Sequence, residues 1–490
     1  MSKSVVIIGA GFAGLSAAAF MARAGWKVSV VEKNETAGGR ARQLCIDGYS
    51  FDMGPSWYWM PDVFERFFEQ FHKKVADYYS LVRLDPSYRV YWSDNFIDIP
   101  ADYNQLRALF DTIEPGSAVK LDRYLKEAGS KYVIGMQNLV YKPGRSVAEF
   151  LDLNTMKNVL NLDVFTSIKK HVAKHFKSPK LRQLMEFPVL FLGALPEDTP
   201  ALYSLMNFAD IKGGTWYPKG GMYSIVLAMK NLAEELGVEF YFNQEVKDIV
   251  IENSAAKKVC TTTTEFTADA VISGADYHFT ETSLLPKEFR TYTETYWNGR
   301  TLAPSCLMYY VGLSKKLNSA IHHSLFFDVP FDKHAKEIYA EPKWPSDPLF
   351  YVSVSSVTDD TVAPENGENL VFLIPVASGL SHDTEELRER YFNRIIERFE
   401  DKTGEEISNS IVVKKSYSVN DFAKDYNSYK GNAYGLANTL MQTAILRPAC
   451  QSKKLKNLFY TGQFTVPGPG VPPSLISGEV VSKQVLKYFN

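Results

Sequence analysis

The sequence predicts an α/β fold in which a Rossmann-like dinucleotide-binding domain is interleaved with an α+β domain that holds an antiparallel sheet and a helical lid. Three observations lead to this prediction. The chain has 490 residues, which is too long for one simple core. A strand–helix–strand pattern opens the chain, and pieces of the same kind return in its middle and at its end. The stretches between these pieces are first helical and then strand-like.

The N-terminal pattern is a βαβ unit. Residues 4–8 (SVVII) have the continuous apolar character of a buried parallel strand, and residues 27–31 (KVSVV) repeat it. The helix expected between them, residues 11–25, is rich in small side chains. Later segments extend the same domain, with helices at 222–236 and 474–488 and strands near 238–242, 246–252, 267–276 and 455–461.

The inserted parts have other patterns. Residues 104–210 are dominated by helical periodicity. The runs 305–313, 349–355 and 370–376 are apolar and strand-like, as expected of an antiparallel sheet that covers something apolar. We therefore assign residues 1–100, 211–280 and 431–490 to the dinucleotide-binding domain, residues 101–210 to a helical docking region and residues 281–430 to the domain with the antiparallel sheet.

Composition excludes several classes of function. The net charge of −2 gives no general attraction to nucleic acid, so no nucleic-acid partner is expected. The four cysteines lie far apart without a CxxC pair, which argues against a cysteine zinc site or a disulfide framework and fits a reducing, cytoplasmic compartment. His171 and His175 are spaced i, i+4, but no carboxylate supports the pair, so no metal site is expected. No signal peptide and no apolar run of about 18–20 residues are found.

A glycine motif directly follows the first strand. Gly9, Gly11 and Gly14 form GxGxxG at the opening of a helix, where they allow a tight turn, close approach of a pyrophosphate and close helix–strand contact. Glu32 ends the second strand, where a carboxylate accepts a hydrogen bond from a ribose hydroxyl. This combination predicts a bound dinucleotide.

The residues that follow separate FAD from NAD. Residues 38–40 read GGR and residues 51–56 read FDMGPS. Arg40 can counter pyrophosphate charge, and the glycines let the backbone run close to a bulky ring system. A nicotinamide-dependent dehydrogenase would normally continue into another βαβ unit without this insertion. The sequence therefore predicts FAD as the cofactor and an FAD-binding Rossmann-like domain.

These residues also carry a family resemblance. EKNETAGGRAR followed by DGYSFDMGPS resembles the start of the flavin amine oxidase superfamily, which includes the phytoene desaturases. The segments 191–206, 213–249 and 431–448 resemble bacterial carotenoid desaturases, and 455–481 resembles the closing flavin motif of that family. The match covers essentially the whole chain. The run WYPKGG at 216–221 and the closing motif are its most specific parts.

The closing motif departs from the common form of the family. Residues 466–472 read VPGPGVP, where the usual desaturase has histidine–proline–glycine–alanine–glycine–isoleucine–proline. A Pro/Gly loop before the final helix can still present backbone N–H groups to a reduced flavin. The resemblance places cofactor contacts at Gly9, Gly11, Ala13, Gly14, Glu32, Lys33, Gly39, Arg40, Gly54, Pro55, Ser56, Val246, Gly462, Gln463, Gly470, Val471 and Pro472.

The resemblance implies a reaction as well. A carotenoid desaturase removes two hydrogens beside a polyene, with a hydride passing to flavin N5 and a proton leaving the adjacent carbon. An apolar C40 substrate offers little to grip, so an apolar tunnel is expected, and the aromatic cluster Trp57–Tyr58–Trp59 lines it or packs in the core. No residue stands out as a catalytic base, and the oligomeric state is not predicted.

Delivery of such a substrate requires contact with a membrane, so peripheral association is expected. Leu160, Val164, Ile168, Val172 and Phe176 form a helical apolar stripe within 160–182, accompanied by lysines and an arginine and followed by the apolar run 184–195. This pattern fits an amphipathic element on anionic lipid. It fits a helix that packs its stripe on the core equally well.

Five other functions remain open at this point. A carotene isomerase or a saturase shares the same motifs. An amine oxidase or a protoporphyrinogen oxidase shares the flavin domain, and a prenyl-binding chaperone of the GDP-dissociation-inhibitor type reuses the fold without flavin. The intact glycine motif, Glu32 and Arg40 argue against the chaperone, and residues 213–221 argue against the amine oxidase.

Overall fold

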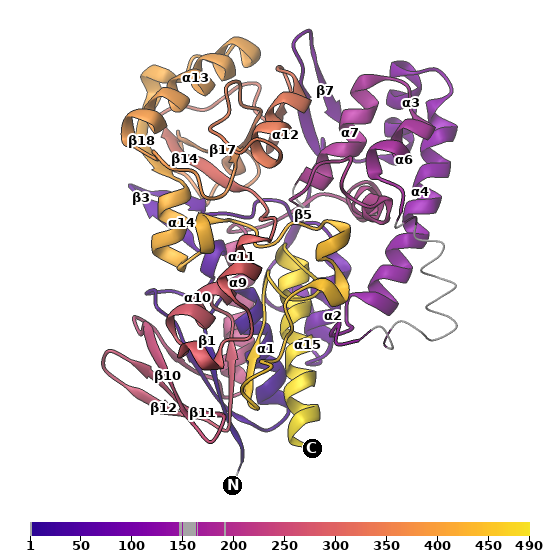
Figure 1. The fold of residues 1–490 in the computed structure, drawn as a ribbon. Coiled ribbons are helices and arrows are strands. Elements are labelled where there is room, and N and C mark those ends of the chain that lie inside the picture. The colour runs from indigo at the N-terminus through magenta and orange to yellow at the C-terminus, as the bar shows by residue number, and fades with distance from the viewer. Residues whose placement is uncertain (1, 147–148, 150–162, 164, 191–192) are drawn as a thin grey trace.

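The computed structural model describes residues 2–146, 149, 163, 165–190 and 193–490. Its lower half in Figure 1 is built around a five-stranded parallel sheet in the order β19-β13-β1-β2-β9. These strands are β19 (Leu458–Tyr460), β13 (Ala270–Ser273), β1 (Ser4–Ile8), β2 (Lys27–Val31) and β9 (Glu239–Tyr241). Segments from the start, middle and end of the chain thus form one sheet, as predicted.

Three helices pack on this sheet: α1 (Phe12–Arg23), α9 (Tyr223–Glu235) and α15 (Val471–Phe489). The small residues of α1 allow α15 to approach closely. A Cβ added at Gly478 of α15 would lie 2.5 Å from the Cβ of Ser16 and 2.6 Å from the carbonyl oxygen of Ala13. A three-stranded antiparallel sheet, β10 (Val246–Glu252), β11 (Ala255–Thr261) and β12 (Glu265–Thr267), extends from the same half.

The upper left of Figure 1 holds a seven-stranded sheet in the order β18-β14-β17-β16-β15-β6-β7. All neighbouring strands in it are antiparallel except β15 and β6. Its strands are β18 (Ile411–Tyr417), β14 (Ser305–Leu313), β17 (Glu368–Val376), β16 (Phe350–Ser353), β15 (His323–Phe326), β6 (Tyr88–Tyr91) and β7 (Phe96–Ile99). The predicted antiparallel sheet is confirmed, but residues 88–99 belong to it although our division places them with the dinucleotide-binding part.

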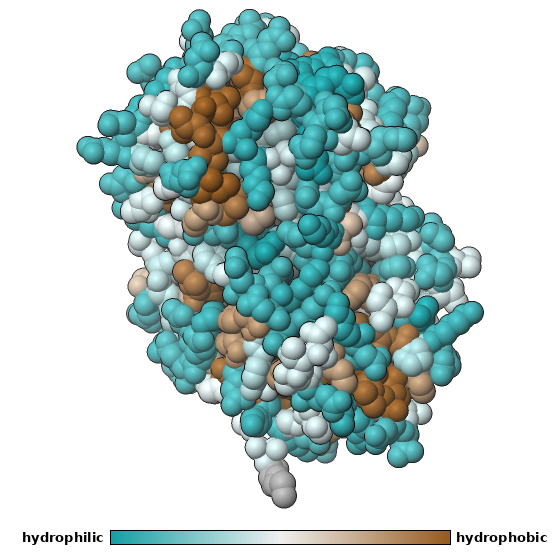
Figure 2. Space-filling view, turned by 90° about the vertical axis from the view of Figure 1, so that its left-hand side faces the viewer, coloured by the Kyte–Doolittle hydropathy of each residue, from teal (hydrophilic) through white to brown (hydrophobic). Residues whose placement is uncertain are grey.

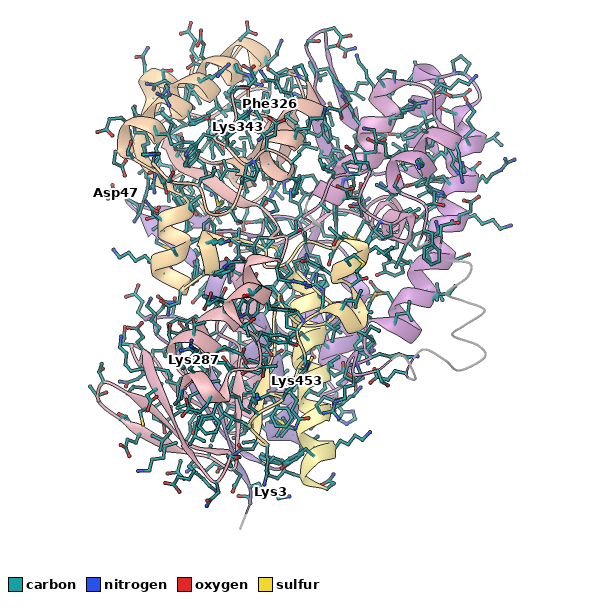
Figure 3. The ribbon with its side chains drawn as sticks, viewed as in Figure 1. Lys3, Asp47, Lys287, Phe326, Lys343 and Lys453 are labelled. Carbon is teal, nitrogen blue, oxygen red and sulfur yellow. The ribbon has the colours of Figure 1, made fainter. Side chains whose placement is uncertain are left out.

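Helices α12 (Phe331–Tyr339), α13 (Glu385–Thr403) and α14 (Val419–Tyr426) accompany this sheet. Phe326 is labelled in Figure 3 within this upper part and is fully buried, stacked on Phe350 with ring centroids 4.2 Å apart. The remaining short elements are α2 (Pro61–Glu69), α10 (Tyr277–Ser283), α11 (Glu294–Asn298) and the two-stranded pairs β3 (Gln43–Ile46) with β4 (Tyr49–Asp52) and β5 (Leu81–Arg83) with β8 (Trp216–Pro218).

A helical region forms the right-hand side of Figure 1. It contains α3 (Tyr103–Ile113), α4 (Ser117–Ile134), α6 (Ile168–His175), α7 (Pro179–Leu190) and α8 (Leu205–Phe208). The predicted membrane-docking stripe lies partly here, while Leu160 and Val164 fall outside the described residues. Ile168, Val172 and Phe176 have no exposed surface and belong to the main hydrophobic core. Of the two alternatives that the stripe left open, its described part takes the second and packs on the protein core instead of facing lipid.

The same helices contain a group of possible metal ligands that the sequence analysis did not expect. Glu127 of α4 lies beside His171 and His175 of α6, so the expectation that no carboxylate accompanies this histidine pair is wrong.

Among the described residues, no helix is long and apolar enough to cross a membrane.

Candidate flavin and substrate site

One cavity of about 370 Å³ collects every residue that the sequence proposes for the cofactor. The nucleotide half contributes the ends of β1, β2 and β13 and the start of α1, while β14, β16 and β17 contribute the opposite wall. The predicted residues that line the cavity are Gly9, Gly11, Ala13, Gly14, Glu32, Lys33, Gly39, Arg40, Gly54, Pro55, Ser56, Val246, Gly462, Gln463, Gly470, Val471 and Pro472.

The glycine motif brings the backbone of the first turn of α1 to the cavity. Gly9 has φ +95°, which an L side chain rarely adopts, and its N–H donates to the carbonyl of Val31 at 2.8 Å. A Cβ at Gly14 would lie 2.0 Å from the carbonyl oxygen of Gly9. Helix α1 begins after Gly11 without a side-chain cap and without an acidic residue in its first turn. Its N-terminus is therefore open to an anion such as pyrophosphate.

Glu32 is a buried carboxylate at the end of β2. Its Oε2 accepts from the Ala10 N–H at 2.7 Å, and its Oε1 accepts from the backbone and side-chain nitrogens of Asn34, both at 2.9 Å. These bonds hold the carboxylate in the cavity wall, and its remaining lone pairs can accept from a ribose hydroxyl. Lys33 lines the cavity too, but its Nζ donates to the Lys424 carbonyl at 2.6 Å.

Arg40 is a second cation in the cavity lining. Its Nη2 donates to Ser428 Oγ at 3.0 Å and to the Asn432 carbonyl at 3.2 Å, whereas its buried Nε has no hydrogen-bond partner among the described residues. Burial lowers the pKa of Arg40 below its ordinary value, and the Asp276 carboxylate partly offsets this shift. A buried cation with a free donor fits a phosphate-bearing ligand.

Gly54 lets the FDMGPS segment run beside this arginine, since a Cβ there would lie 2.4 Å from the Arg40 carbonyl oxygen.

The closing motif differs in one respect from the prediction. Helix α15 begins at Val471, three residues before the expected start, so Pro472 and Pro473 lie in its first turn instead of in the preceding loop. Proline has no N–H, but this loss is tolerated in a first turn. Gly470 caps the helix at φ +117°, and no side chain caps it. Val471 is therefore the first helical residue whose N–H can point to a ligand.

The wall contributed by the seven-stranded sheet is mainly apolar. Cys306 and Met308 of β14 and Leu373 of β17 line the cavity. Burial raises the pKa of the Cys306 thiol to about 12, so the thiol stays protonated near neutral pH and acts as an apolar group.

The predicted aromatic cluster divides between core and cavity. Trp57 and Trp59 line the cavity, whereas Tyr58 is completely buried, stacks on Phe64 and shares a 3.0 Å hydrogen bond with Tyr79. The two roles that the sequence left open, lining the cavity and packing in the core, are therefore both present. Alternation along an extended segment explains the division, because successive side chains point to opposite sides.

One chain of polar groups enters the apolar wall. The Tyr351 hydroxyl donates to Ser56 Oγ at 2.9 Å and lies 2.6 Å from Nδ1 of His323, whose ring stacks on Trp57 at 4.2 Å between centroids. Burial lowers the pKa of His323 well below its ordinary value, so the imidazole is neutral. No motif in the sequence indicates this chain of polar groups, because its members come from three separate segments.

Sequence reasoning also missed Gly274, Ala275 and Asp276, which line the cavity directly after β13. The signal was present, because residues 267–276 read as a parallel strand ending in a turn, and ligands bind at the carboxyl ends of such strands. Asp276 caps α10 by accepting from the Phe279 N–H at 3.2 Å, and burial raises its pKa.

The cavity as a whole fits FAD. The uncapped N-terminus of α1 and the unpartnered Nε of Arg40 would suit a pyrophosphate, Glu32 would suit a ribose, and Val471 at the start of α15 lines the same cavity.

Comparison with known proteins agrees with this geometry. A family model described as flavin containing amine oxidoreductase matches residues 12–486. A carotenoid 3,4-desaturase of Haloarcula japonica is 41% identical over 489 residues, covering 99% of this chain and 98% of that protein. A zeta-carotene-forming phytoene desaturase of Myxococcus xanthus is 30% identical, covering 99% and 94%.

The fold is shared more widely. The crystal structure of an oxidoreductase from Methanosarcina mazei superposes with a TM-score of 0.65 at 18% identity, covering 98% of this chain and 100% of that one. With the family match over nearly its entire length, this chain belongs to the flavin containing amine oxidoreductase family.

Proposed function

We propose that this protein is an FAD-dependent carotenoid desaturase, an oxidoreductase that acts on CH–CH bonds and introduces double bonds into a polyene. The similarity to a carotenoid 3,4-desaturase at 41% identity, against 30% for the phytoene desaturase of Myxococcus xanthus, favours a late step over desaturation of phytoene. The cavity carries the proposal structurally, because it joins a dinucleotide cradle to an apolar wall.

The protein's own residues position the substrate and exclude water. FAD, when bound, supplies the hydride acceptor. The side chains of β14, β16 and β17 hold a substrate by shape, since a carotenoid offers few polar groups to bond. Trp57 and Trp59 give this wall a rigid aromatic edge, fixed by the 2.9 Å hydrogen bond from Trp59 Nε1 to Thr215 Oγ1.

A bulky residue in this wall tests the proposal. We expect Cys306→Trp to retain FAD but to desaturate its substrate at least about tenfold more slowly. The larger side chain would project into the space that the polyene needs. Cys45→Trp is the matched control, since Cys45 is exposed and lies outside the cavity lining. Turnover by Cys306→Trp equal to that of Cys45→Trp would contradict this assignment of the wall.

Membrane contact is the second part of the proposal, and we place it on residues 440–446. Leu440, Met441, Ile445 and Leu446 expose 41%, 68%, 36% and 42% of their surface within seven consecutive residues. The neighbouring Arg447 bonds the carbonyls of Gln463 and Phe464 beside the cavity. An apolar substrate dissolved in lipid would then meet the protein beside residues that are bonded to the cavity lining.

The face of the protein shown in Figure 2 is less suitable for contact with lipid. The face shown in Figure 2 is covered mainly by hydrophilic residues, and its hydrophobic residues form separate patches. Such a face suits water better than lipid. Binding to a lipid interface requires that several neighbouring large apolar side chains enter the lipid. Residues 440–446 provide such a group.

Vesicle binding tests the location. We expect Met441→Asp/Leu446→Asp to reduce co-sedimentation with phosphatidylcholine–phosphatidylglycerol vesicles by about tenfold or more, because two exposed apolar side chains would no longer insert into the lipid. Val412→Asp, at a 57% exposed position on β18, should bind like the unchanged protein. Equal binding by all three proteins would exclude residues 440–446 as the contact.

A further inference from the structure

Three side chains with metal-binding atoms meet between α4 and α6, in the helical region. His171 and His175 are one helical turn apart on α6 and therefore share one face. Glu127 reaches them from α4: its Oε2 lies 3.8 Å from His171 Nε2 and 3.7 Å from His175 Nε2. The ligand atoms of the three residues all lie within 4.8 Å of one another.

His171 supplies an independent sign of a ligand. Its side chain is 3% exposed, and its Nε2 is buried without a hydrogen-bond partner among the described residues. A buried polar atom left unpaired costs free energy, and native proteins rarely keep one without a reason. A metal ion between the three side chains would use the lone pair of this nitrogen.

We infer that Glu127, His171 and His175 form a binding site for a divalent transition-metal ion of the zinc type. Two imidazole nitrogens and one carboxylate oxygen are a common ligand set for this ion, with a water molecule as the fourth ligand. In a tetrahedral site such atoms are about 3.4 Å apart, so the three atoms have to close by roughly 0.3–1.4 Å. Glu127 is 42% exposed in its side chain, which leaves an entry path for the ion and for the water.

The surrounding charges set the expected strength of binding. Lys131 of α4 lies near His171, and Arg123 and Lys174 lie near His175, so all three oppose a cation. The ammonium group of Lys131 is paired with Asp163 at 2.9 Å, which reduces its effect. We therefore expect binding weaker than at a preformed four-ligand structural zinc site.

The ion would be structural in this protein. Glu127, His171 and His175 all lie outside the cavity lining, so the ion would not touch the flavin or the substrate. It would instead tie α4 to α6, two helices otherwise joined there by packing of the Tyr124 ring against both imidazoles at 5.2 and 5.3 Å between centroids. Metal binding should thus raise the stability of the protein and leave the flavin spectrum unchanged.

Metal titration of the untagged, flavin-loaded full chain tests the inference. After dialysis against EDTA, we expect one equivalent of Zn²⁺ by calorimetry, a higher melting temperature, and visible absorption bands of a tetrahedral site with Co²⁺. His171→Ala and His175→Ala should each lose these signals, while His175→Cys should keep them, because a thiolate is also a zinc ligand.

His278→Ala is the matched control. His278 lies 3.4 Å from Glu294 but belongs to no group of three metal-binding side chains among the described residues, so its loss should leave metal uptake unchanged. The flavin content of each variant reports whether it has folded. If the unchanged protein gives no Co²⁺ bands, or takes up no more Zn²⁺ than the double variant His171→Ala/His175→Ala, the site does not exist.

Discussion

Replacing Gly14 with alanine is expected to give a protein that retains little or no FAD. The added Cβ would lie 2.0 Å from the Gly9 carbonyl oxygen, a distance at which one of the two backbone segments has to move. Either movement displaces the first turn of α1 from the cavity, and with it the N–H groups that would face a bound pyrophosphate. We expect a loss in FAD affinity of at least about a hundredfold, which corresponds to about 2.7 kcal/mol.

The measurement is the flavin-to-protein absorbance ratio of purified protein, followed by FAD titration of the apoprotein. Gly299→Ala is the control, because a Cβ there meets its nearest neighbour at an ordinary 3.5 Å. Circular dichroism separates a local loss of FAD from general unfolding. A Gly14→Ala protein as yellow as Gly299→Ala would show that the turn does not bind the cofactor.

Replacing Arg447 with methionine is expected to destabilise the protein by about 3 kcal/mol or more and to lower its flavin content. The guanidinium is buried and donates to the carbonyls of Leu436, Gln463 and Phe464 and to Asn438 Oδ1. These bonds tie residues 436–438 to the closing motif, and methionine would leave their acceptors unpaired. Burial lowers the pKa of Arg447 to about 10, so the group is still charged near neutral pH.

Urea unfolding measures the change in stability, and absorbance measures the flavin content. Arg447→Lys should rescue both only in part, since a single ammonium group cannot reproduce the planar fork of donors. Arg390→Met on α13 is the control, because that side chain is exposed. A stability of Arg447→Met within about 0.5 kcal/mol of this control would mean that the network does not hold the closing motif.

Local patterns in the sequence were sufficient for much of the fold. Residues 305–313 form one strand with the predicted bounds, and α1 lies within the predicted 11–25. Periodicity did not predict what an apolar stripe packs against, because that depends on the partner of the segment and not on its own pattern. The stripe of Ile168, Val172 and Phe176 is apolar in either environment, so the pattern alone could not distinguish the protein core from lipid.

The same distinction holds for the candidate site. The dinucleotide cradle depends on short motifs whose backbone geometry requires particular residues, and all the predicted positions reached one cavity. The apolar wall depends on Cys306, Tyr351 and Leu373, which come from three separate strands. Their meeting is set by strand pairing over long sequence distances, and a single sequence carries little signal for it. The approach of Glu127 to His171 and His175 was missed for the same reason.

The central claim is that this protein desaturates a carotenoid, and product analysis by absorption and mass tests it most directly. Purified protein loaded with FAD would be incubated with phytoene, lycopene or a γ-carotene-type substrate in lipid vesicles. We predict that one substrate loses two hydrogens, with a mass lower by about 2 Da and an absorption band at longer wavelength, because each new double bond extends the conjugated chromophore. An unchanged mass with an altered spectrum would identify an isomerase, and a mass higher by about 2 Da a saturase. Unchanged substrate in every case, with FAD bound, would contradict the assignment.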